Sequence, residues 1–342
     1  MDAMGRWRWR KALAAGVASA ALISYVLISE AELSGGCSSG ESMFAYTVYG
    51  REMIRSTDVA VFSGGKEERV TDDGQSGDPS FNPDGSRVVF STGRLGLWDP
   101  EYGRGENGFE RRALFTTSTS TFGQGDLLTS GPFDTEPDWS PDGSKVVFVR
   151  EGRYGEGDDE LWIVDVQTRK ERLLLHFPNE RHRENQFRSP AWSPDGRQIA
   201  FFHAPHDRGK RSVGVWLINR DGSNLRRLPA TTRTGGDQTW SDDLSWSPAG
   251  NALAFDGATE LGNGIHALEL AESHTRLLNE DAGYPAWSPD GSRIAFFDLT
   301  WEGSNPSWRL MTTFSQGSRM EPVEGSRPVE FYAYEELDWT CK

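Results

Sequence analysis

The sequence contains only two cysteines and six histidines in 342 residues. Two cysteines cannot build a zinc ribbon, an iron–sulfur cluster or a scaffold of several disulfides. Basic residues are also few, since 36 lysines and arginines stand against 51 aspartates and glutamates, for a formal net charge of -15. A surface of this sign repels the phosphates of nucleic acid, so we expect no DNA or RNA binding and favour cations, basic peptides or neutral partners.

Aromatic residues, glycine and proline are plentiful by contrast. Aromatic residues make up 11% of the chain, which is enough for a large core and excludes wholesale disorder. The 38 glycines and 17 prolines are too many for long helices and fit a chain that turns often. All-β propellers and barrels can reach this length as one domain.

The first 31 residues have the features of an export signal. Residues 6–11 carry four basic side chains and precede an uncharged stretch from Ala12 to Ile28, and Ser29 and Ala31 then supply small residues at the two positions that a signal peptidase reads. The stretch is also at the lower limit for spanning a bilayer, so an uncleaved anchor is an alternative, as is a buried core helix. We predict that residues 1–31 are a signal peptide or membrane anchor and residues 32–42 a flexible tether. The positive-inside rule then places the rest of the chain outside the cytoplasm, in the periplasm or at the cell surface.

One repeated sequence motif recurs along the chain after Ser42. Its pattern is P-x-W-S-P-D-G-x-x-[IV]-[AV]-F, with a degenerate fourth copy that has Ala249 in place of the aspartate. The aromatic anchors of the five copies recur at intervals of 41–58 residues, at Phe81, Trp139, Trp192, Trp246 and Trp287. Periods of this size are typical of propellers and other repeat arrays.

Each repeat predicts four antiparallel strands. The Ser-Pro-Asp-Gly segment is a tight turn, since proline fixes φ, aspartate bonds locally and glycine accepts the left-handed conformation. It joins the strand that ends at the aromatic anchor to a strand such as Val-Val-Phe, and two further strands follow. Four such strands make one propeller blade, whereas an isolated hairpin module could not bury its faces.

The two ends of the chain predict a shared sixth blade. Residues 43–71 supply three strands without an innermost one, and Glu336–Thr340 mimics Glu136–Ser140 just before the chain stops. We therefore predict a six-bladed β-propeller over residues 43–342, closed by pairing of the terminal strands, with Trp339 as the sixth anchor. Ring closure of this kind removes exposed sheet edges.

These repeats resemble the WD-repeat-like propeller repeats of the TolB family, and the resemblance covers nearly everything after Ser42. It implies a bacterial envelope or periplasmic location and a binding role within an envelope complex. The family also includes propeller domains fused to peptidases. The separate N-terminal α/β domain of the type member has no counterpart in this sequence, so the resemblance extends to the propeller alone.

The hairpin geometry predicts a disulfide between Cys37 and Cys341. The innermost strand should end near Cys341 where the strand from Met43 begins, and antiparallel neighbours lie about 5 Å apart. An oxidising compartment permits the bond. Leu33–Cys37 also resembles a lipoprotein acylation box, although Leu33 lies four residues before the cysteine rather than three. Acylation of Cys37 is the competing interpretation and excludes the disulfide.

No motif predicts catalysis, a metal site or a cofactor. Residues 36–40 match G-x-S-x-G by letters, but no strand precedes them and no helix follows, so we interpret the match as chance. His203 and His206 with Asp207 lack a third ligand at useful spacing, and we interpret them as part of a solvated loop. The aspartates of the repeated turns could suggest a set of calcium-binding sites, but the residue preferences of tight turns explain their recurrence.

Acidic residues recur in or beside the connections that enter the innermost strands. We expect such connections to converge on one mouth of the central channel, where several carboxylates would concentrate negative potential. The candidate site for a cation or for a basic segment of a partner comprises Asp78, Asp134, Glu136, Asp138, Asp242, Asp243 and Asp338. The alternative is that these acids are solvated loop residues, and we favour it.

The sequence thus leads to three hypotheses of function. The first is a non-enzymatic binding module of the bacterial envelope with a protein or peptide partner, a cation at the channel mouth, and membrane contact only through the N-terminal segment. The alternative is a propeller hydrolase or lyase that acts on a glycan or peptide at the channel mouth. The third is an accessory subunit that regulates a membrane complex through its anchor.

Overall fold

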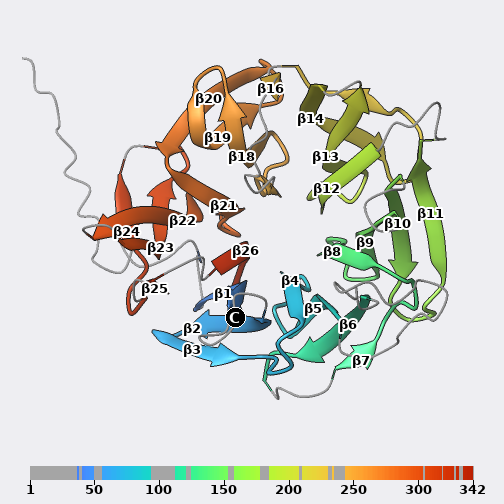
Figure 1. The fold of residues 1–342 in the computed structure, drawn as a ribbon, viewed down its shortest axis with the longest axis horizontal. Coiled ribbons are helices and arrows are strands. Elements are labelled where there is room, and N and C mark those ends of the chain that lie inside the picture. The colour runs from blue at the N-terminus through green and yellow to red at the C-terminus, as the bar shows by residue number, and fades with distance from the viewer. Residues whose placement is uncertain are drawn as a thin grey trace, which may run out of the picture. The chain divides into compact units, whose positions relative to one another are not determined.

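The computed structural model is a propeller of six four-stranded antiparallel blades, and the six blades form a ring (Figure 1). The structure describes residues 37, 41–49, 56–93, 112–120, 125–152, 158–177, 185–207, 210–229, 233–234, 243–302, 305–317, 319–326, 329–330 and 334–341. They lie within the compact unit Gly35–Lys342. No stretch of these residues forms a helix, and hence none forms a helix that could cross a bilayer. The predicted export segment lies outside the described residues.

Each blade runs outwards from the channel in chain order, except blade 1, which combines the two ends of the chain. Blade 1 consists of β26 (Tyr334–Cys341), β1 (Ser42–Tyr49), β2 (Thr57–Ser63) and β3 (Lys66–Arg69). Blade 2 consists of β4 (Ser76–Phe81), β5 (Arg87–Thr92), β6 (Ala113–Ser118) and β7 (Asp126–Leu127). Blade 3 consists of β8 (Asp134–Trp139), β9 (Lys145–Arg150), β10 (Glu160–Asp165) and β11 (Glu171–His176). Blade 4 consists of β12 (Asn185–Trp192), β13 (Gln198–Asp207), β14 (Lys210–Asn219) and β15 (Arg226–Arg227). Blade 5 consists of β17 (Leu244–Trp246), β18 (Ala252–Thr259), β19 (Gly262–Glu269) and β20 (His274–Glu280). Blade 6 consists of β21 (Ala282–Trp287), β22 (Arg293–Glu302), β23 (Asn305–Phe314) and β24 (Met320–Pro322). Two short strands that the sequence did not predict, β16 (Arg233–Thr234) and β25 (Val329–Glu330), pair with β14 and β23.

The ring closes as predicted. β26 pairs with β1 in antiparallel register, with Trp339 opposite Phe44 and Cys341 opposite Ser42. A disulfide joins Cys37 to Cys341, whose Cα atoms lie 5.8 Å apart. Each innermost strand also contacts the innermost strand of the next blade, including β26 with β4 across the junction. The disulfide prediction is therefore confirmed, and acylation of Cys37 is excluded by it.

The hydrophobic core lies between the blades. Separate clusters fill the spaces between successive blades, for example Phe90 with Val61 between blades 1 and 2, and Phe202 with Phe255 between blades 4 and 5. All six aromatic anchors belong to this core and are only 5–9% exposed, at Phe81, Trp139, Trp192, Trp246, Trp287 and Trp339. Full burial of one large apolar side chain contributes about 1.5–3 kcal/mol, so the repeated anchors supply much of the stability.

The repeated turns have the chemistry that the sequence predicted. In the turn of blade 3, Gly143 adopts a φ of 68° and its N–H donates to the Ser140 carbonyl at 2.8 Å. The Asp142 carboxylate accepts from the Ser144 N–H at 2.9 Å. Asp84, Asp195 and Asp290 accept in the same way from the residue two positions later. The turn explanation of the recurring aspartates is therefore confirmed.

Candidate functional site

The innermost strands carry a bulge that re-aims their side chains toward the next blade. Three residues before the anchor, the backbone is left-handed in five blades, with φ between 46° and 60°, at Asp78, Glu136, Ser189, Tyr284 and Glu336. The pairing register shifts at this place in β4, β8, β12 and β21. Bulges of this kind bend a strand and redirect a side chain. A proline follows in four of the five, where the bulge leaves no ladder bond for an N–H to make.

The side chains at the bulge position accept hydrogen bonds from the backbone of the next innermost strand, at or beside the same position. The Glu336 carboxylate accepts from the Asp78 N–H at 2.6 Å, and Asp78 accepts from the Glu136 N–H at 3.1 Å. Glu136 accepts in turn from the Ser189 N–H, and the Ser189 hydroxyl accepts from the Leu244 N–H at 2.9 Å. Three carboxylates and the Ser189 hydroxyl therefore form a chain of hydrogen bonds through five consecutive blades.

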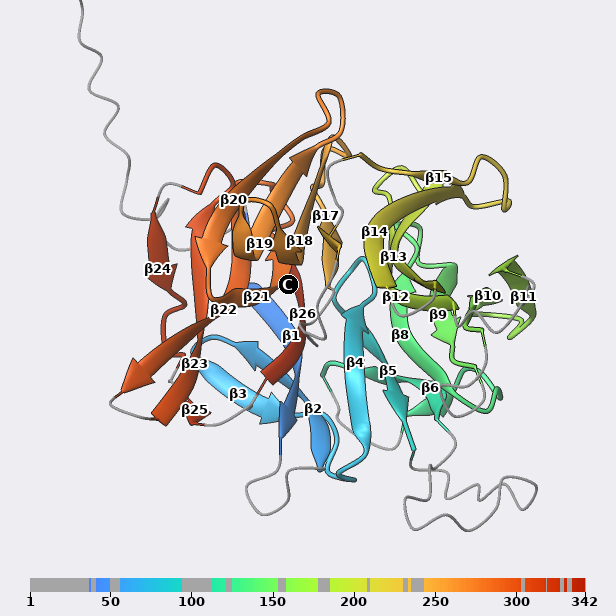
Figure 2. The same cartoon turned by 45° about the horizontal axis from the view of Figure 1, so that its top comes forward.

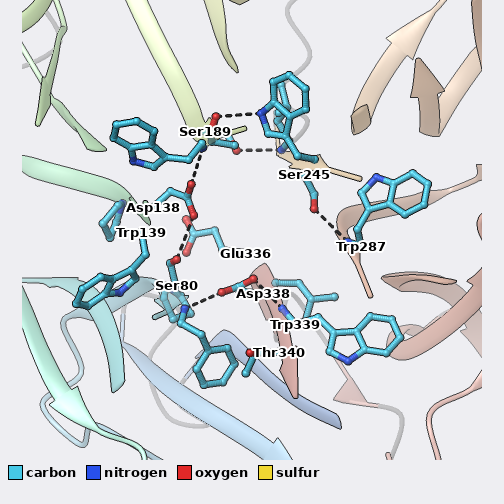
Figure 3. Close-up of a pocket in the computed structure, with 18 of the residues that line it drawn as sticks. Ser80, Asp138, Trp139, Ser189, Ser245, Trp287, Glu336, Asp338, Trp339 and Thr340 are labelled. Carbon is cyan, nitrogen blue, oxygen red and sulfur yellow. Dashed lines mark hydrogen bonds between the residues drawn. The ribbon is translucent and has the colours of Figure 1, made fainter. Parts of the chain in front are cut away.

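A second set of such bonds lies one residue before each anchor. Asp138 accepts from the Trp192 N–H of the following blade at 2.7 Å and from the Ser80 hydroxyl of the preceding blade at 3.2 Å (Figure 3). Asp338 accepts from the Phe81 N–H at 2.6 Å. Hydrogen bonds of this kind, from an amide to a carboxylate, are stronger than those between neutral groups.

In blade 5 a serine takes the place of the aspartate at this position. The Ser245 hydroxyl of blade 5 accepts from the Trp287 N–H of blade 6 at 3.1 Å, as Figure 3 shows. The geometry of the contact is thus retained while its charge is lost. The acidic character of the channel is concentrated on blades 1 to 3.

Both sets of side chains line one cavity of about 480 Å³, enclosed by the innermost strands. Its other walls are the inner edges of the aromatic anchors and a series of prolines. Six carboxylates line it, from Asp78, Glu136, Asp138, Asp243, Glu336 and Asp338. None of the described residues that line it is a lysine, arginine or histidine. The cavity therefore carries a strong negative potential whenever these groups are ionised.

Burial controls the protonation of these acids. It raises the pKa of Glu136 to about 8, with a further contribution from the charge of Asp78. It also raises the pKa of Asp138 to about 7, helped by the nearby charge of Asp338, whose own pKa burial raises as well. Burial acts in the same direction on Asp78, but the hydrogen bond with Glu336, the charge of Arg112 and further hydrogen bonds together outweigh it and hold the pKa of Asp78 below its usual value. At neutral pH the cavity holds both carboxylates and carboxylic acids.

Two arginines approach the cavity acids from outside the lining. The Arg188 guanidinium lies 3.6 Å from a Glu136 oxygen, and that of Arg112 lies 3.9 Å from Asp78. Arg188 is 37% exposed and also lies within 4.0 Å of Glu151 and Asp159. Its charge is therefore divided among three carboxylates, and it opposes the rise in the pKa of Glu136 only in part.

We expect the stability of the protein to fall as the pH rises from about 6.5 to 8.5. The pKa values of Glu136 and Asp138 are higher in the folded protein than in an unfolded chain, so the folded state holds more protons in this window and raising the pH favours unfolding. The loss should be on the order of 2 kcal/mol, since one pKa unit corresponds to about 1.4 kcal/mol. The pKa values of the buried His203 and His266 are about 4, so these groups affect the pH dependence of stability below this window.

Urea unfolding at several pH values measures this effect. The Glu136→Gln variant retains an acceptor for the Ser189 N–H but cannot ionise, so its stability should change much less between pH 6.5 and 8.5. Asp126→Asn, whose carboxylate is 73% exposed, is the matched control and should follow the wild type. A wild-type stability that is constant across the window contradicts the assignment.

The structure brings together five of the seven predicted site residues. Asp78, Glu136, Asp138, Asp243 and Asp338 line the cavity. The expectation that the acids lie in solvated connections is wrong for four of these five, because they lie in strands, are half-buried and bond to the next blade: Asp78, Glu136, Asp138 and Asp338.

Asp134 and Asp242 are the two that the cavity does not include. Asp134 is fully buried at the start of β8, where Arg150 contacts both of its oxygens at 2.7 and 3.0 Å, and its placement at the channel mouth is therefore corrected. Asp242 lies outside the described residues. Sequence reasoning missed Glu336, although its place in the repeat, equivalent to that of Glu136, could have identified it.

The remaining candidate motifs supply no catalytic or metal centre among the described residues. No group of three or more histidine, cysteine, aspartate or glutamate side chains is placed to hold a metal ion in this part of the chain. His203 and His206 lie in strand β13, not in a loop, and His203 is buried with its ring stacked on Phe177 at 4.7 Å. Of the G-x-S-x-G match, Ser38 and both glycines lie outside the described residues.

Comparison with known proteins places this fold among TolB-like propellers. No protein-family model matches the chain. The chain is 27% identical over 221 residues to the uncharacterised peptidase YuxL of Bacillus subtilis, a match that covers 64% of this chain and 29% of that protein. It is 32% identical over 90 residues to the Tol-Pal system protein TolB of Thioalkalivibrio sulfidiphilus, covering 26% of this chain and 18% of TolB. The chain is thus matched to less than a third of the length of either relative.

The structural similarity covers most of this chain. The crystal structure of TolB from Acinetobacter baumannii superposes with a TM-score of 0.62 at 17% identity, covering 88% of this chain and 67% of that one. This chain therefore has a TolB-like six-bladed β-propeller fold.

Proposed function

We propose that this protein is an exported binding module whose central cavity receives a positively charged segment of a protein partner. The observation that carries the proposal is the convergence of six carboxylates on one cavity without a basic side chain among its described lining residues. Its volume of about 480 Å³ lies in the range of ligand pockets, about 300–1,000 Å³. The Cys37–Cys341 disulfide supports export, because such bonds persist in oxidising compartments.

The inter-blade hydrogen bonds make the cavity a rigid receptor and leave it capacity to bind. A carboxylate offers about four acceptor sites, and the bonds to neighbouring blades occupy two of those of Asp138. The remaining sites suit a lysine ammonium or an arginine guanidinium. A peptide side chain fits this geometry better than a bare metal ion, since no three donors among the described residues are gathered for coordination.

The same contacts favour binding over acid–base catalysis. The pKa of Asp138, about 7, would suit a general acid, but both of its oxygens accept hydrogen bonds from neighbouring blades. Asp138 therefore has the environment of a structural carboxylate whose remaining acceptor sites can bind a ligand. The similarity to YuxL, named as a peptidase, covers too little of that protein to outweigh this.

We expect an N-acetylated, amidated hexa-arginine peptide to bind the protein, and to bind more tightly at pH 8.5 than at pH 6. Ionisation of Glu136 and Asp138 over this range increases the negative charge of the cavity. Isothermal titration calorimetry should show a Kd at least tenfold higher for the Glu136→Gln/Asp138→Asn variant. In the control variant, Asp126→Asn, the Kd should change less than twofold.

Two results would overturn the proposal. One is an equal loss of affinity in the cavity variant and in the control, which would show attraction to the general surface charge. The other is binding of the peptide that does not change with pH. Far-ultraviolet circular dichroism of the variants verifies that the propeller remains folded.

A further inference from the structure

Blades 3 and 4 carry a positively charged surface on a strongly acidic protein. It lies on the face of the ring that bears the turns between first and second strands, such as residues 140–144 and 193–197, and we call this the turn face. Figure 1 shows the two blades side by side. Six exposed cations lie here, in or next to turns: Arg169, Lys170, Arg172, Arg197, Arg220 and Arg226.

Backbone contacts make this surface continuous across the two blades. The Arg172 guanidinium of β11 donates to the Arg220 carbonyl of blade 4 at 2.7 Å, and the Arg220 N–H donates to the Arg197 carbonyl at 2.9 Å. Within blade 3, the Val166 N–H donates to the Ser144 carbonyl at 3.0 Å, which places the turn between β10 and β11 beside the turn at 140–144. The cations of three segments therefore share one face.

The acids within this surface are engaged in their own turns. Asp195 and Asp221 cap the N–H groups of Arg197 and Ser223, and Asp165 accepts from Thr168 and pairs with Lys145. Among the ion pairs of the described residues, Arg197 is the one cation of the six with a carboxylate partner, Asp195 at 3.8 Å.

The equivalent turn of the neighbouring blade does not carry these cations. In blade 5 the corresponding turn, residues 270–273, carries Glu272 and no cation. At physiological ionic strength the screening length is about 8 Å, so the excess of cations acts locally in spite of the overall negative charge.

Cys37, the first described residue, lies on this same face. Cys37 is bonded to Cys341, and the Cys341 carbonyl lies 3.2 Å from the position that a Cβ of Gly85 would take in the turn at residues 82–86. The uncharged stretch ends at Ile28, nine residues before Cys37. Nine residues span at most about 30 Å. A bilayer that held this stretch would therefore lie close to the turn face.

We propose that the turn face of blades 3 and 4 rests on an anionic bilayer, with its arginines on the lipid phosphates. The cations are exposed and dispersed over several turns, which fits a flat array of phosphates better than one peptide. Arginine suits this role because its planar guanidinium binds phosphate through two hydrogen bonds. Cations near an anionic bilayer each contribute about 1 kcal/mol of attraction in general. The proposal is independent of the central cavity.

Vesicle co-sedimentation of the unit Gly35–Lys342 tests this surface without the N-terminal segment. The unit contains the whole ring, its core and its disulfide, so it should fold alone. We expect binding to vesicles of phosphatidylcholine and phosphatidylglycerol, and none to phosphatidylcholine alone. The Arg169→Gln/Arg226→Gln variant should bind at least tenfold more weakly.

The matched control removes two exposed cations from blades 1 and 6. In Lys66→Gln/Arg319→Gln the lost charges lie beside acids, since Arg319 pairs with Glu321 at 2.9 Å, and binding should change less than twofold. Equal losses in the two variants, or equal binding to both kinds of vesicle, would overturn the proposal. Binding to polyglutamate without binding to anionic vesicles would overturn it in favour of an acidic protein partner.

Discussion

Replacement of Trp339 by alanine is expected to reduce the free energy of unfolding by about 3–5 kcal/mol, the usual cost of truncating a buried large aromatic side chain. Trp339 is 5% exposed and its ring lies 4.8 Å from that of Phe44. It also packs against residues of blade 6, including Ala286. The side chain thus holds the C-terminal strand to the N-terminal strand and to the last blade, and its loss opens a cavity at the closure of the ring.

Urea unfolding followed by circular dichroism measures this loss. Trp339→Phe keeps much of the apolar contact and should cost considerably less. Leu261→Ala removes an apolar side chain that is 51% exposed and should change stability by less than about 0.5 kcal/mol. If Trp339→Ala is as stable as the wild type, the equivalence of the six anchors is refuted.

Removal of the disulfide is the second change with a large expected effect. Cys37 and Cys341 are 304 residues apart in sequence, and in the chain-entropy model a cross-link of this span stabilises the folded state by more than about 4 kcal/mol. The Cys37→Ser/Cys341→Ser variant should therefore unfold at a much lower urea concentration. Its native spectrum should persist, because β1 and β26 still pair along their length.

Chemical reduction of the disulfide in the wild type provides an internal control for this prediction. Treatment with a phosphine reductant should lower the Tm of the wild type to that of the double variant and leave the variant unchanged. Thiol counting on the denatured, unreduced protein should find no free thiol, since both cysteines are in the bond. Identical unfolding of the wild type and the double variant would show that strand pairing alone closes the ring.

Both predictions concern features that the sequence determined by itself. The turn signals, the spacing of the aromatic anchors and the truncated copy at Trp339 predicted six blades and their closure. These features are local, since a Pro-Asp-Gly turn fixes its own geometry and a repeated unit must bury its faces against neighbours. The disulfide followed because closure places the two ends of the chain next to each other.

The site was decided by the tertiary structure. Asp78, Glu136 and Glu336 face the next blade because a bulge gives each a left-handed backbone and shifts the register, and no local pattern encodes that shift. Asp134 also carries a carboxylate and lies in the same strand as Glu136, yet it pairs with Arg150.

The protonation of the acids and the basic surface also depend on distant contacts. The pKa of Asp138 reflects burial and the approach of Asp338 from another blade, 200 residues away in sequence. The cations of blades 3 and 4 become one surface only where Arg172 reaches the turn at Arg220. Composition predicted an acidic protein, but only the fold sorts its charges into an acidic cavity and a basic face, because charges interact through distance in space and burial rather than through order along the chain.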